Sequence, residues 1–69
     1  MKPSLGDVIR RAGTGDIAAV KATADFCRFR LGLNYQQTLD LVRKVLPEMD
    51  EAKWDNLLYQ VDEMESDCG

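Results

Sequence analysis

The chain has 69 residues, with nine Lys and Arg against twelve Asp and Glu, two cysteines and no histidine. This length allows one domain, and the lack of histidine excludes Ser-His-Asp and Cys-His catalytic triads and Cys₂His₂ zinc sites. The charge is uneven, because residues 1–46 carry eight basic and four acidic side chains, whereas residues 47–69 carry one basic and eight acidic ones. Such a split bears on the choice of partner rather than on the fold.

Residues typical of helix starts and helix ends occur throughout the chain. No run of residues alternates between apolar and polar side chains in the manner of a β-strand. Ser4 is placed to cap a first helix, which Gly13 ends. A second helix is expected from about Asp16 to Leu31, because Asp16 lies in a turn that supplies capping oxygens and Gly32 follows the apolar periodicity.

Two further helices are expected in the second half of the chain. Asn34 is placed to cap a helix over residues 35–46, which Pro47 ends. Asp50 is placed to cap the last helix, over residues 51–65, and the apolar residues around this cap have the spacing of a hydrophobic staple.

The sequence therefore predicts an all-α fold, a compact bundle of about four short helices that forms one domain over residues 1–69, with a frayed tail at residues 66–69. No apolar run approaches the length of a membrane span, and charged residues interrupt any signal-peptide core. Two cysteines are too few for a disulfide framework, so we expect a cytoplasmic protein with free thiols.

The second helix is apolar on two sides, which indicates burial on two sides. This helix is either central in the monomer or packs its second stripe against another copy of the chain, which would stabilise so small a domain. The first stripe consists of Ile17, Val20, Ala24, Cys27 and Leu31. The predicted dimer interface, on the second stripe, consists of Ala19, Ala22, Phe26 and Phe29.

The segment from Phe26 to Lys44 resembles a helix-turn-helix hairpin, with a glycine after the first helix and a polar cap before the second. Glutamine can read adenine in the major groove, and basic side chains can hold phosphates. However, Arg28 stands where such a hairpin usually has a small residue, so the segment is equally interpreted as a helical hairpin with a glycine cap. The candidate DNA-binding residues are Gln36, Gln37, Arg43 and Lys44.

The last helix is acidic on the face opposite its apolar stripe, and Tyr59 lies at the centre of that face. The face is either solvated or a binding surface for a basic partner, with the tyrosine as its anchor. The candidate partner-binding residues are Asp55, Tyr59, Asp62 and Glu63.

No motif for catalysis, metal binding or phosphate binding is found, so we expect a non-enzymatic protein without a cofactor. In broad character the chain is similar to the compact, acidic helical proteins by which bacteriophages inhibit host regulators. This resemblance implies a small regulatory protein that masks the DNA-binding surface of a transcription regulator. The alternative is a dimeric helix-turn-helix repressor, which net acidity disfavours because phosphate contacts supply much of the affinity for DNA.

Overall fold

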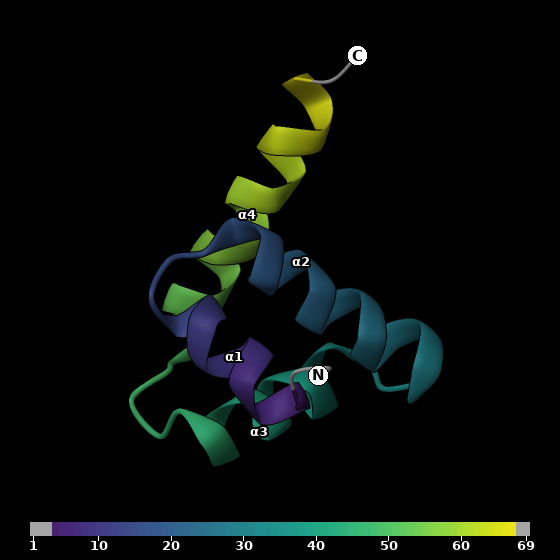
Figure 1. Ribbon diagram of the computed structural model, residues 1–69, viewed down its shortest axis with the longest axis vertical. Coiled ribbons are helices and arrows are strands. Elements are labelled where there is room, and N and C mark those ends of the chain that lie inside the picture. Colours follow the sequence, from purple (N-terminus) through teal and green to yellow (C-terminus); the bar gives the residue numbers. More distant parts are fainter. Residues whose placement is uncertain (1–3, 68–69) are drawn as a thin grey trace.

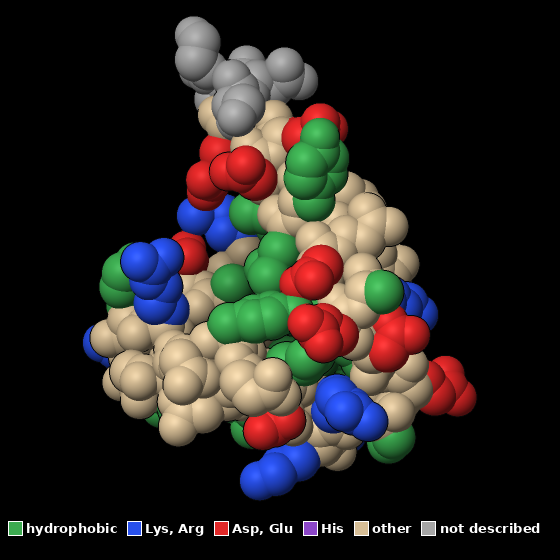
Figure 2. All heavy atoms as spheres, turned by 180° about the vertical axis from the view of Figure 1, so that it is seen from behind, with side chains coloured by type: hydrophobic (Ala, Val, Ile, Leu, Met, Phe, Trp, Pro, Cys, Tyr) green, Lys and Arg blue, Asp and Glu red, His purple; other side chains and the backbone are tan. Residues whose placement is uncertain are grey.

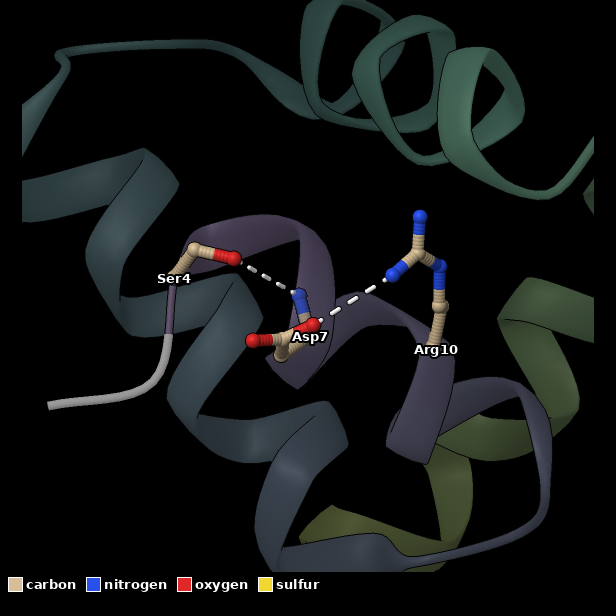
Figure 3. A network of polar contacts seen from close by, with 3 residues as sticks. All are labelled: Ser4, Asp7 and Arg10. Carbon is tan, nitrogen blue, oxygen red and sulfur yellow. Dashed lines mark hydrogen bonds and ion pairs between the residues drawn. The ribbon is translucent and has the colours of Figure 1, made fainter. Parts of the chain in front are cut away.

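The first helix, α1 (Leu5–Gly13), begins at a cap formed by Ser4. The computed structural model describes residues 4–67, with side chains to residue 65. The Ser4 hydroxyl oxygen accepts a hydrogen bond of 3.3 Å from the Asp7 backbone N–H, and the Asp7 carboxylate accepts a further bond of 3.3 Å from Arg10 (Figure 3). The predicted cap is thus confirmed, and an ion pair within the helix accompanies it.

The second helix changes its hydrogen-bonding pattern part-way along. α2 (Ile17–Asp25) begins at the Asp16 cap and continues without a break into a π-helical turn, η1 (Phe26–Arg30). The N–H of Leu31 donates to the carbonyl of Phe26 at 3.2 Å, one residue further back than in an α-helix. The helix therefore covers nearly all of its predicted range, but the prediction of one uniform helix to Leu31 was wrong over the last turn.

This wide turn alters which side chains reach the core. Gly32, with φ of 66°, follows it and lets the chain leave the helix. Because a π-turn holds more residues than an α-turn, side chains after Phe26 rotate away from the stripe that α-helical spacing predicts. Cys27 remains buried, whereas Leu31, predicted on the same stripe, is exposed.

The last two helices also begin at their predicted caps. α3 (Tyr35–Val45) starts at Asn34, and α4 (Glu51–Asp67) starts after Asp50, whose carboxylate accepts a bond of 2.7 Å from a backbone N–H. α4 continues to Asp67, so residues 66–67, which we expected in a frayed tail, are helical. The rest of that predicted tail, including the second cysteine, lies outside the described residues.

The core lies where the helices meet. α1 packs against both α2 and α3, and α4 packs against α2 (Figure 1). Trp54 is the largest fully buried side chain, and Met49 is buried in the same cluster, so the two apolar residues on either side of the Asp50 cap have the spacing predicted for a hydrophobic staple. The buried apolar cluster consists of Ile9, Ala12, Ala19, Val20, Leu39, Val42, Met49, Trp54 and Leu57.

The C-terminal half of α4 projects beyond the other helices (Figure 1). Its apolar stripe is buried at Trp54 and Leu57, partly buried at Val61, and 53% exposed at Met64. The same helix thus provides the centre of the core at one end and a protruding, largely solvated segment at the other. Within residues 4–67, no helix combines the length and the apolar character that a membrane span needs.

Candidate functional site

The acidic face of α4 lies on the projecting end of the molecule, where Tyr59 is 60% exposed. Asp62 and Glu63 are exposed beside it, and neither forms an ion pair with another side chain among residues 4–65. Figure 2 shows acidic side chains on this projecting end. The structure therefore brings three of the four candidate partner-binding residues together as an accessible surface.

Asp55, the fourth candidate, is already engaged within the chain. Its carboxylate accepts a hydrogen bond from the hydroxyl of Tyr35, at the start of α3. This bond is the largest of the causes that raise the pKa of Tyr35 to about 12, followed by partial burial and the negative charge of Asp55. Asp55 thus ties α3 to α4 instead of presenting a free carboxylate.

Lys21 joins α2 to the projecting half of α4. Its ammonium group lies 2.7 Å from a carboxylate oxygen of Glu65 and 3.0 Å from one of Asp25. The hydrogen bonds to Glu65 and then to Asp25, with their negative charges, raise the pKa of Lys21. All three groups are largely exposed, so the triad orients α4 more than it stabilises the fold.

An apolar cleft of about 350 Å³ lies between the second helix, the start of α3 and α4. Figure 2 shows hydrophobic side chains gathered in the middle of this face, next to acidic ones. Buried Trp54 and partly buried Leu58 form one wall, and Arg28 stands on another. An apolar centre with charged groups at its edge is the arrangement found in protein interfaces. The remaining lining residues are Ala24, Leu33, Asn34, Tyr35 and Thr38.

The predicted dimer interface is divided by the structure. Phe26 and Phe29 are 38% and 71% exposed, and Ala22 is exposed. Ala19, by contrast, is 7% exposed and belongs to the core cluster. Its inclusion in the interface was wrong, because α2 turns that position toward the other helices. Apart from Ala19, the residues of this predicted interface are therefore exposed in the monomer, and both phenylalanines lie on the surface.

The candidate DNA-reading glutamines are occupied by bonds within α3. The Gln37 side chain accepts a bond of 2.9 Å from the Asn34 N–H and so completes a capping box. The Gln36 amide donates to Asp40 at 3.3 Å. Arg43 and Lys44 are exposed in the last turn of the same helix. The helix thus offers basic groups for phosphates, but both of its glutamine side chains form hydrogen bonds with neighbouring residues of the chain.

The one cysteine among the described residues, Cys27, is fully buried. Burial raises the pKa of its thiol, and a hydrogen bond with Thr38 opposes that shift in part. Such a thiol is inert packing rather than a nucleophile. Nowhere in the described part of the chain do three or more Cys, Asp or Glu side chains gather in a manner that could hold a metal ion.

Sequence reasoning missed the contacts that link helices across the molecule. Neither Tyr35 nor Lys21 was predicted to contact another helix, yet each forms a bond to a carboxylate on α4. No spacing rule along one helix connects residues on different helices, so the sequence held no signal for either pair. Comparison of the chain with models of protein families, with curated proteins and with solved structures finds no match.

Proposed function

We propose that this protein is a small non-enzymatic regulator that binds a basic protein through the acidic face of α4. The observation that carries the proposal is the exposure of Tyr59 between Asp62 and Glu63, two carboxylates that form no ion pair among residues 4–65, on a helix end that projects from the body (Figure 1). An exposed tyrosine supplies a large contact area at a low cost in side-chain entropy. Carboxylates around it attract a partner and orient it.

The kind of partner follows from the chemistry of this surface. Carboxylates pair well with arginine, often through two parallel hydrogen bonds. Arginines that contact phosphates in a DNA-binding protein can form the same bonds with Asp62 and Glu63. We therefore propose a transcription regulator as the partner, with its DNA-binding surface masked by α4. This mode of action is the one implied by the resemblance to phage inhibitors of host regulators.

The experiment is capture of partners by the immobilised chain, with and without nuclease, followed by competition with DNA. We expect a nuclease-resistant protein partner whose DNA is released as the chain is added. The double variant Tyr59→Ala with Asp62→Lys removes the anchor and reverses a charge. Loss of an interface anchor costs about 2 kcal/mol or more, which weakens binding about thirtyfold.

The matched control is Glu48→Lys, which changes the net charge as Asp62→Lys does but lies before α4. Retained capture by the control and lost capture by the double variant support the proposal. Equal capture by all three proteins contradicts it. A partner that disappears with nuclease, together with a gel shift of duplex DNA by the chain alone, favours the DNA-binding alternative.

A further inference from the structure

A second surface, distant from Tyr59 on its helix, is an open apolar groove between α1 and the second helix. Its volume is about 300 Å³, and it is lined by Leu5, Val8, Ala22 and Phe26. Phe29, the most exposed of the large hydrophobic side chains, follows Phe26 in the π-helical turn. Contiguous exposed apolar surface on a small protein marks an interaction site.

The turn beside this groove is basic. Arg28 and Arg30 flank Phe29 in the sequence, and the guanidinium carbon of Arg28 lies 5.3 Å from the centre of the Phe29 ring. Neither arginine forms an ion pair with a carboxylate among the side chains that the structure describes. Direct pairing of two such grooves would bring arginines of both copies together, and like charges in contact oppose association. The groove is therefore suited to an acidic, apolar occupant.

The projecting half of α4 has that character. Met64 is 53% exposed on the apolar side of the helix, and it follows the partly buried Val61 by one turn. Glu63 and Glu65 flank Met64 on either side of the helix, since adjacent residues are about 100° apart around the axis. Glu65 already pairs with Lys21, whereas Glu63 has no ion pair among residues 4–65.

We propose that two copies of the chain associate reciprocally, with Met64 of each copy seated in the groove at Phe26 and Phe29 of the other. In this arrangement Glu63 faces the arginines of the partner's π-helical turn. Each copy offers one groove and one helix end, so the contact is repeated by a two-fold axis and closes at a dimer. Tyr59 lies on the opposite side of α4 from Met64, so this association does not depend on Tyr59 or Asp62, and Glu63 is the one residue that both proposals use.

The test is the mass in solution, measured by analytical ultracentrifugation over a range of concentrations. Wild type is expected to be dimeric, and Phe29→Asp and Met64→Asp are each expected to be monomeric, because each variant alone loses both copies of the contact. An equal mixture of the two variants is expected to form a dimer that is weaker than that of wild type, because one of its two contacts stays intact and the other is lost. The control Tyr59→Asp stays dimeric.

A monomeric wild type at every concentration overturns the proposal. A dimeric wild type whose Met64→Asp variant is also dimeric overturns it as well, because that result indicates groove-to-groove pairing. Circular dichroism checks that each variant is folded, as expected for side chains that are more than half exposed. If either aspartate variant loses its helical circular dichroism, the variants Phe29→Gln and Met64→Gln are used in place of the pair. The same masses in solution are then expected, and the same results would overturn the proposal.

Discussion

Tyr35 and Asp55, which are 20 residues apart in the sequence, are joined by a hydrogen bond from the tyrosine hydroxyl to the carboxylate. The bond connects the first residue of α3 to α4, and Tyr35 also lines the apolar cleft. It removes Asp55 from the free acidic face and leaves Tyr59, Asp62 and Glu63 as the surface for a partner. Two predictions concern this bond.

Replacement of the Tyr35 hydroxyl by hydrogen, in Tyr35→Phe, is expected to lower the free energy of unfolding by about 1 kcal/mol. A hydrogen bond to a charged group contributes about 1.5–3 kcal/mol, and the exposure of this pair reduces its share. Urea unfolding followed by circular dichroism measures the change. The control is Tyr59→Phe, for which no loss is expected. Equal stability of the two variants contradicts a structural role for the bond.

The stability of the fold is expected to fall in alkaline solution because of the same pair. The pKa of Tyr35 is raised from its ordinary value of 10.0 to about 12 in the folded chain. Below pH 10 the hydroxyl is protonated in both states, so the stabilisation is complete; between pH 10 and 12 only the unfolded chain loses the proton, and the stabilisation is lost.

Absorbance of tyrosinate near 295 nm measures this titration. In a Tyr59→Phe background only Tyr35 contributes, and we expect a midpoint of about 12. Adding Asp55→Asn removes both the charge and the anionic acceptor, so the midpoint is expected to fall toward 10.0. A midpoint that Asp55→Asn leaves unchanged contradicts the assigned cause.

Truncation of Trp54 is expected to unfold the chain. Trp54 is fully buried at the centre of the core, and large-to-alanine changes of aromatic core residues cost about 3–5 kcal/mol. A domain of this size rarely has more than about 3–5 kcal/mol of stability in total, so Trp54→Ala should lose its helical circular dichroism at 25 °C. Trp54→Phe keeps most of the volume and should remain folded. A native spectrum for Trp54→Ala would show that the core lies elsewhere.

The end of the π-helical turn is expected to require glycine. Gly32 has φ of 66°, and an added Cβ would meet no other atom within 4 Å. The cost of Gly32→Ala, about 1–2 kcal/mol, therefore comes from the backbone conformation alone. The matched control is Gly6→Ala in α1, where the added Cβ makes only ordinary contact and higher helix propensity should raise stability by about 0.5–1 kcal/mol. Thermal unfolding that shows the same sign for both variants contradicts this account.

The helix starts were predictable because their determinants are local. Ser4, Asp16, Asn34 and Asp50 each accept a hydrogen bond from the backbone N–H three residues later, so the cap and its partner lie within one turn. Of the candidate site, the exposed acidic face around Tyr59 was predictable for a similar reason, because helical spacing alone places it opposite the core stripe. These features were read from the sequence and are found in the fold.

Other features depend on which helices meet. Helical spacing gave the second helix two apolar stripes, and only the packing of the helices against one another decided that Val20 and Cys27 are buried while Phe26 and Phe29 stay on the surface. The π-helical turn after Asp25 has no counterpart in any capping or propensity rule, and Leu31, which follows this turn, is exposed.

The sequence by itself thus determined the helical segments, their caps and the acidic face of α4. The tertiary structure decided that Ala19 belongs to the core and that Asp55 is bonded to Tyr35. The physical reason is one of range. A cap or a helical stripe depends on groups a few residues apart, whereas burial and the bonds between helices depend on groups that folding alone brings together.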